Sequence, residues 1–191
     1  MRNGRAKDCS VQIGKAEQSD YDDILELQER CYIENLPPEK RKDGFLSAKF
    51  TFAQIAAMAR DLGIVVARSG DRTVAYMCAS RIDLTPRPPI LDAMLKSLEG
   101  GTFREKPLSD ARMFVYGPVC IDEKCRGVGL LKGMFDRLKA SLAGDFEVGV
   151  AFIASDNPRS LAAHVSGLEM DKLALFKYGG KEYHAIAFSL T

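Results

Sequence analysis

The spacing of hydrophobic residues divides the chain into helical and extended segments. Apolar residues recur at helical spacings of three and four in five segments, which are 20–36, 51–63, 90–99, 129–142 and 157–166. Extended patterns occupy the segments 11–15, 64–68, 73–82, 112–122, 146–154, 170–178 and 181–190. This order fits neither an all-parallel sheet nor a simple meander. It predicts an α/β fold in which a twisted, mixed sheet of about seven strands carries helices on both faces.

Local signals add detail to one of these helices and to two of the segments between elements. Thr51 followed by Gln54 is a capping-box pair, which is typical of a helix start. The face that this helix is expected to bury comprises Phe52, Ile55, Ala56 and Met58. The charged segment 39–49 and the glycine-containing segment 101–110 are predicted to be loops.

One stretch combines three features that bind anions. Residues 116–121 form a short extended run broken by a Gly-Pro pair, and residues 122–129 form a polar loop with glycines. A helical pattern then begins at Leu130. A strand, a glycine loop and a helix N-terminus together direct backbone N–H groups at an anion, and Arg126 adds a positive charge. The stretch therefore predicts a site for a phosphate-bearing ligand.

Composition narrows the classes of partner. The chain has 191 residues, and we expect residues 1–10 to be a flexible tail and residues 11–191 to be a single domain. A net charge of +1 gives no field that would attract nucleic acid or an anionic membrane, and no apolar run reaches the length of a membrane span. Five scattered cysteines and two histidines have no metal-binding spacing. We therefore expect no metal site, and reduced thiols in the cytoplasm.

The glycine loop resembles the coenzyme A loop of the GCN5-related N-acetyltransferases (GNAT). The family pattern is Arg/Gln-x-x-Gly-x-Gly/Ala, and the matching residues here are Arg126, Gly127, Val128, Gly129, Leu130 and Leu131. Leu131 stands where a small residue is usual. A register that begins at Lys124 restores a glycine at the last position of the pattern but loses the arginine at the first position. We prefer the register that begins at Arg126, because the spacing from Asp122 to Arg126 fits the family's usual V-D-x-x-x-R-G sequence.

A second segment supports the same resemblance. Asn157, Pro158 and Ser160 follow a strand and open a helix, and they are similar to the N-x-x-S/A segment that follows the family's fifth strand. The two motifs together cover roughly the C-terminal half of the chain. The resemblance implies the GNAT fold, acetyl-CoA (coenzyme A) as cofactor, and transfer of an acetyl group by direct attack of an amine on the thioester.

The resemblance also implies which residues bind the coenzyme. Pantetheine is expected to pair with the backbone of Val119, Cys120 and Ile121, where the Gly-Pro kink would splay the strand from its neighbour. The six loop residues, Asn157 and Ser160 complete the expected coenzyme site. Core packing or helix capping is the alternative role for each of these side chains.

Proton transfer has several candidate residues. The family often places a tyrosine seven residues after the asparagine as general acid, and His164 occupies that position here. Tyr116 on the coenzyme strand is a rival proton carrier, and Asp122 or Glu123 could act through water. Cys120 and Cys125 could be nucleophiles, but no histidine adjoins either of them in sequence, so we prefer direct transfer. Each of these residues also has a purely structural alternative.

The acceptor is the least defined part of the function. Tyr32, Glu34, Phe45 and the connector Thr85–Pro89 are expected to line its site, because these segments are irregular and carry ring or charged groups. The expected partner is a small-molecule or protein amine, and a homodimer is left open. Two other functions also stay open. One is an acyl-CoA sensor of the same fold without turnover, and the other is a nucleotide-binding α/β protein.

Overall fold

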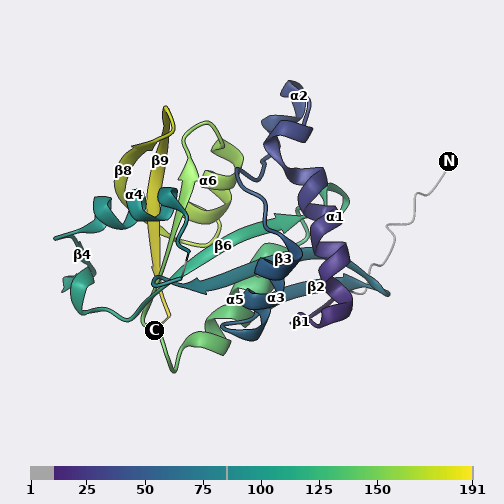
Figure 1. The fold of residues 1–191 in the computed structure, drawn as a ribbon, viewed down its shortest axis with the longest axis horizontal. Helices are drawn as coiled ribbons and strands as arrows, with labels where there is room; N and C mark the ends of the chain where they lie inside the picture. The colour runs from purple at the N-terminus through teal and green to yellow at the C-terminus, as the bar shows by residue number, and fades with distance from the viewer. Residues whose placement is uncertain (1–10, 85, 191) are drawn as a thin grey trace.

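The computed structural model of the chain describes residues 11–84 and 86–190 (Figure 1). Within these residues, seven strands form one mixed sheet in the order β1-β2-β3-β6-β7-β9-β8. The strands are β1 Val11–Lys15, β2 Ile64–Ser69, β3 Arg72–Arg81, β6 Met113–Ile121, β7 Val148–Ala154, β8 Asp171–Tyr178 and β9 Lys181–Ser189. Neighbouring strands are antiparallel except β6 and β7, which are parallel. The expected mixed sheet is confirmed, whereas the tail expected at 1–10 lies outside the described residues.

Helices cover both faces of the sheet, as expected. They are α1 Tyr21–Cys31, α2 Pro38–Arg41, α3 Phe52–Arg60, α4 Pro89–Leu98, α5 Leu130–Leu142 and α6 Pro158–Val165. Because successive strand residues point to opposite faces, β3 contributes to two cores. Tyr76 and Cys78 pack with α1 and α3, whereas Ala75 and Met77 pack with α5. A third core lies between α4 and the strands β7, β8 and β9.

Two segments predicted to be loops contain secondary structure. Within 101–110, β4 (Thr102–Phe103) pairs with β5 (Lys106–Pro107), and a short 3-10 helix follows. The short helix α2 occupies the start of the charged segment 39–49. Neither element has an apolar periodicity long enough to be recognised in the sequence.

Two helix predictions are also corrected. The first helix ends at Cys31 and does not continue to residue 36, because the backbone becomes extended at Tyr32. Phe52 is 45% exposed and is not part of the buried face of α3. Phe52 is the first residue of that helix. Its ring makes an edge-to-face contact with Tyr21, with 5.6 Å between the ring centroids.

β6 is interrupted at the Gly-Pro pair that was expected to kink it. Gly117 and Pro118, which are joined by a cis peptide, together oppose the single residue Cys78 of β3. This is a β-bulge. On the other side, pairing with β7 reaches only Val115 and Val150, and the described residues show no β6–β7 ladder beyond them. The two strands therefore diverge, and the later part of β6 has an unpaired edge (Figure 1).

The bulge also changes which face each side chain of β6 enters. In a regular strand Tyr116 and Cys120 would lie on the same face, because they are four positions apart. Here Tyr116 packs in the core beneath α5, whereas Cys120 packs in the core beneath α1. The extra residue therefore places one polar ring and one thiol on opposite sides of the same strand.

Candidate functional site

The glycine loop and the start of α5 surround a cavity. Gly127 and Gly129 have φ angles of +80° and +81°, in the left-handed region that favours glycine. A Cβ atom added at either position would meet no atom within 4 Å, so backbone conformation and not crowding requires glycine here. Gly129 is the N-cap of α5, and the first-turn N–H groups of that helix have no intrahelical partners. The loop has the backbone arrangement that binds anions.

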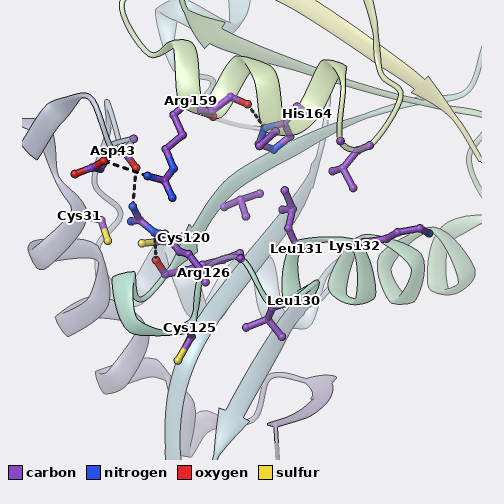
Figure 2. Close-up of a pocket in the computed structure, with 18 of the residues that line it drawn as sticks. Cys31, Asp43, Cys120, Cys125, Arg126, Leu130, Leu131, Lys132, Arg159 and His164 are labelled. Atoms are coloured by element: carbon purple, nitrogen blue, oxygen red, sulfur yellow. Dashed lines mark hydrogen bonds and ion pairs between the residues drawn. The ribbon is translucent and has the colours of Figure 1, made fainter. Parts of the chain in front are cut away.

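The cavity, here called the loop cavity, has a volume of about 410 Å³ and lies beside the diverging edge of β6 (Figure 2). The predicted coenzyme residues that line it are Val119, Cys120, Ile121, Arg126, Gly127, Gly129, Leu130, Leu131 and Ser160. Val128 does not line it, because its side chain is 72% exposed to solvent. Three further residues with charged side chains, Asp43, Lys132 and Arg159, were missed by sequence reasoning but also line the cavity.

Arg126 is tied to backbone carbonyl groups. Its Nε donates to the Ile121 carbonyl at 2.9 Å, and its Nη1 donates to the Asp43 carbonyl at 2.6 Å. These bonds join the glycine loop both to β6 and to a segment far away in sequence (Figure 2). Arg126 therefore shapes the loop cavity as well as contributing positive charge to it.

The distant segment, residues 43–46, is also held by the start of α6. Asn157 is buried, caps α6 by accepting the Ser160 N–H at 3.4 Å, and donates through Nδ2 to the Phe45 carbonyl at 3.0 Å. Arg159 pairs with the Asp43 carboxylate at 3.1 Å. The N-cap role predicted for Asn157 is thus present, and the same side chain holds segment 43–46, which lines the loop cavity.

Tyr116 and His164, predicted separately as rival proton carriers, are hydrogen-bonded to each other. The Tyr116 hydroxyl lies 3.1 Å from His164 Nε2, and His164 Nδ1 lies 2.7 Å from the Ser160 carbonyl. Because a carbonyl can only accept, Nδ1 carries the proton and Nε2 accepts the Tyr116 O–H. The Tyr116 ring also packs edge-on against Phe135 and Phe188. The two residues therefore form one oriented unit.

Burial sets the protonation state of this unit. It lowers the pKa of His164, and the hydrogen bond to the Ser160 carbonyl opposes that effect only in part. Burial also raises the pKa of Tyr116 well above its ordinary range. Both side chains are therefore uncharged near neutral pH. A neutral imidazole that accepts a hydroxyl proton can act as a base through that hydroxyl.

A second cavity of about 180 Å³ adjoins the first and is here called the apolar cavity. Five residues line both cavities, and they are Phe45, Leu46, Val119, Ser160 and His164, whereas Tyr116 lines only the second. Among the described residues that line the apolar cavity, none is Asp, Glu, Lys or Arg. Its walls come from residues 45–48 and Phe50, the start of α4, and the diverging strands β6 and β7. The Tyr116–His164 unit thus lies where a charged cavity meets an uncharged one.

Only some of the residues that were expected to line the acceptor site line either cavity. Phe45 and Pro88 line the apolar cavity, but Tyr32 and Glu34 line neither of the two cavities. The Tyr32 ring is covered by the ammonium group of Lys49, 4.8 Å from the ring centroid. Thr85 lies outside the described residues.

The other proton-transfer candidates are engaged elsewhere. Asp122 pairs with Arg30 at 2.9 Å and Glu123 with Lys40 at 2.9 Å, and neither carboxylate lines the loop cavity or the apolar cavity. The Cys120 thiol lies 3.9 Å from the Leu27 carbonyl, on the face of the sheet that α1 covers. A hydrogen bond with the buried thiol of Cys31 raises the pKa of Cys120, and so does the burial of Cys120 itself. The Cys120 thiol therefore stays protonated. Such a thiol is a poor nucleophile.

Across residues 11–84 and 86–190, no helix is both long and apolar enough to cross a membrane. In the same part of the chain, no three His, Cys, Asp or Glu side chains are grouped so as to hold a metal ion.

Comparison with known proteins identifies the fold. No family model and no curated protein matches the sequence. Among solved structures, an N-acetyltransferase from Staphylococcus aureus Mu50 matches with a TM-score of 0.63 and 14% identity, over 95% of this chain and 99% of that one. The yncA protein of Salmonella typhimurium, in a structure with its cofactor acetyl-CoA, matches with a TM-score of 0.60 and 15% identity, over 95% and 94% of the two chains.

A GNAT superfamily phosphinothricin acetyltransferase from Sinorhizobium meliloti, in complex with acetyl-CoA, has a TM-score of 0.59 and 15% identity. The match covers 94% of this chain and 88% of that one. Because the sequence identities are only 14–15%, these similarities establish the fold alone. The chain has the GNAT fold, as the two sequence motifs predicted.

Proposed function

We propose that this protein is an acetyl-CoA-dependent N-acetyltransferase in which an amine attacks the thioester directly. The observation that carries the proposal is the meeting of two cavities at the Tyr116–His164 unit, beside the unpaired edge of β6. One cavity is charged and bounded by a helix N-terminus, and the other is uncharged. The GNAT fold supports the same function, because the S. typhimurium and S. meliloti structures hold acetyl-CoA.

The loop cavity suits a coenzyme that has phosphates at one end and a long uncharged arm. The N–H groups of the glycine loop and of the first turn of α5 would bind phosphate oxygens, with Lys132 and Arg159 adding charge. Arg126 would act mainly by holding the loop in shape, since two of its donors already bond carbonyls. The unpaired edge at Val119–Ile121 would bond the amide groups of the arm.

The residues at the junction supply proton transfer and positioning. Bound acetyl-CoA supplies an acetyl group activated as a thioester. The Tyr116 oxygen can take a proton from the attacking nitrogen while its own proton passes to His164 Nε2, 3.1 Å away. The reverse movement returns a proton toward the departing sulfur. Backbone N–H groups on the unpaired edge of β6 would polarise the thioester carbonyl.

Thermal unfolding with acetyl-CoA tests the proposed coenzyme site, and NAD and ATP are measured separately as comparison ligands. Acetyl-CoA at about a hundred times its Kd should add roughly 2.7 kcal/mol, which raises Tm by on the order of 5–10 °C in a chain of this size. A larger shift with NAD would instead favour the nucleotide-binding alternative. No shift with any ligand would contradict the proposed coenzyme site.

Turnover separates an enzyme from a sensor of the same fold. Release of coenzyme A is followed with a thiol reagent in the presence of a broad panel of amines. We expect release that depends on the amine. Saturable binding of acetyl-CoA without release for any amine would instead assign the protein as a non-catalytic acyl-CoA sensor.

A further inference from the structure

The apolar cavity has no group that would bind a charged acceptor. Its polar lining residues among the described ones are Ser47, Ser80, Tyr116, Asn157, Ser160 and His164. Tyr116, Asn157 and His164 already have hydrogen-bond partners within the protein. A carboxylate or ammonium group buried there without an opposite charge would cost several kcal/mol. The cavity therefore selects against acceptors that carry a charge into it.

The volume of the cavity limits the size of the acceptor. A cavity of about 180 Å³ is small for a ligand site. An apolar cavity of about 150 Å³ holds one benzene molecule. The apolar cavity is therefore matched to a single ring with a small substituent, and its aliphatic and aromatic walls, among them Leu91 and Phe152, suit an apolar ring.

The protonation state at the junction limits the kind of amine. An aliphatic ammonium ion must lose a proton before it can attack, and the described lining of the apolar cavity offers no carboxylate to receive or hold that charge. The nitrogen of an aromatic amine is uncharged at neutral pH, because its lone pair is shared with the ring. Such an amine can enter the cavity without a separate deprotonation step and without a counter-ion.

We propose that the acceptor is a small aromatic amine, with one ring, a primary amino group and no charged substituent. This inference rests on the proposed acetyl transfer. The nitrogen forms a bond to the acetyl carbon and the carbon–sulfur bond breaks, so the products are an aromatic amide and the free thiol of the coenzyme. The proton that the nitrogen loses passes through Tyr116 and His164 to the sulfur.

Three amines of similar size test the acceptor class. These are p-toluidine, which is neutral, benzylamine, which is cationic, and p-aminobenzoate, which carries a carboxylate in place of the methyl group. Coenzyme A release and the amide product are measured for each at neutral pH. We expect kcat/KM for p-toluidine to exceed that for either charged amine by on the order of a hundredfold, the cost of burying an unpaired charge.

A charge introduced at the rim of the cavity should reverse part of this preference. Ser47 is exposed and lines the apolar cavity, so Ser47→Asp places a carboxylate there with little risk to folding. We expect the ratio of benzylamine to p-toluidine activity to rise about tenfold. Ser109→Asp is the control, because Ser109 is exposed and lines neither cavity, and it should leave the ratio unchanged.

The outcomes distinguish this inference from the proposed function. If a charged amine is acetylated better than p-toluidine, the acetyltransferase stands and the aromatic acceptor is wrong. If butyryl-CoA is preferred over acetyl-CoA about tenfold or more, the cavity receives the acyl chain, and the inference is again overturned. If acetyl-CoA raises Tm but none of the three amines reacts, the aromatic acceptor is wrong, whereas the transferase function fails only if the broad amine panel also gives no release of coenzyme A.

Discussion

The two cavities that meet at Tyr116–His164 have opposite characters. The loop cavity, about 410 Å³, is lined by the charged side chains of Asp43, Arg126, Lys132 and Arg159 and by the N-terminus of α5. The apolar cavity, about 180 Å³, has no charged side chain in its described lining. The change from charged to apolar lining occurs across the few residues that the cavities share, which are Phe45, Leu46, Val119, Ser160 and His164.

The contrast follows from how each cavity is built. In the loop cavity, a contiguous loop and helix start supply backbone N–H groups, and residues from 43–46 and 159–168 add to the lining. The apolar cavity is made by side chains from segments that are distant in sequence, and the divergence of β6 from β7 opens the space between them. We infer that the loop cavity binds the coenzyme and that the apolar cavity binds the acceptor amine. The following changes should affect one cavity, or their junction, without the other.

Tyr116→Phe should have the largest effect, because it removes the hydroxyl at the junction and keeps the ring that packs on Phe135 and Phe188. We expect kcat to fall by about 10² to 10³, with the Kd for acetyl-CoA unchanged. Steady-state kinetics and calorimetric titration measure the two quantities. Tyr21→Phe is the control, since the Tyr21 ring packs in the core beneath α1 and lines neither cavity. Equal losses in both variants would contradict a proton-carrying role.

Gly129→Val should damage the loop cavity alone. A β-branched residue at φ +81° is strained by roughly 1–2 kcal/mol and will shift the N–H groups of the loop. We expect the affinity for acetyl-CoA to fall by on the order of thirtyfold. Titration of Gly144→Val provides the comparison, because Gly144 is exposed and has no crowding atom within 4 Å. If Gly129→Val binds like the wild type, the loop does not hold the coenzyme.

Ile90→Trp should fill the apolar cavity alone. Ile90 lies at the start of α4, is partly buried and lines that cavity but not the loop cavity. We expect kcat/KM for an aromatic amine to fall by about tenfold, because the larger tryptophan side chain occupies the acceptor space. Acetyl-CoA binding should be retained. An unchanged kcat/KM would place the acceptor elsewhere.

Acidification should destabilise the junction through His164. Its pKa is below the ordinary value of 6.5 in the folded protein, so the unfolded chain binds the proton more readily between the two values. The free energy of unfolding that this histidine contributes is complete above pH 6.5 and is lost as pH falls from 6.5 toward the folded pKa. Thermal unfolding from pH 8 to pH 5 should therefore show a steeper loss for the wild type than for His164→Gln. Parallel curves would contradict a neutral buried imidazole.

Arg159→Gln should have the smallest effect. Arg159 is half-exposed and pairs with Asp43, and such surface pairs contribute about 0–1 kcal/mol. We expect acetyl-CoA to bind about threefold more weakly at low salt, with the difference shrinking at high salt as charges are screened. The amine KM should not change. A loss as large as that of Gly129→Val would assign Arg159 a direct and dominant contact.

The parts of this site that could be predicted from sequence are the local ones. The glycines at positions 127 and 129 and the capping residue Asn157 act within a few residues of a helix start, so their spacing predicted the loop and the starts of α5 and α6. Tyr116 and His164 were each recognised, but their hydrogen bond joins residues 48 positions apart. Only the packing of α6 against the sheet brings them together.

The long-range contacts could not be predicted from sequence. Segment 43–46 reads as part of a charged loop, and its positioning depends on bonds to Asn157 and Arg159 that span more than a hundred residues. Tyr32 and Glu34 line neither cavity; α1 ends at Cys31, and the backbone is extended at Tyr32 before a short 3-10 helix, Ile33–Asn35. No periodicity or spacing encodes such contacts.

The most direct test is to mix the protein with acetyl-CoA and p-toluidine and to quantify both products, free coenzyme A and N-acetyl-p-toluidine. If the two cavities hold the two reactants at Tyr116–His164, the products appear in equal amounts, and Tyr116→Phe slows both by the same factor. Coenzyme A release without amide, or amide formation that is indifferent to Tyr116→Phe, would contradict a transfer reaction at this junction.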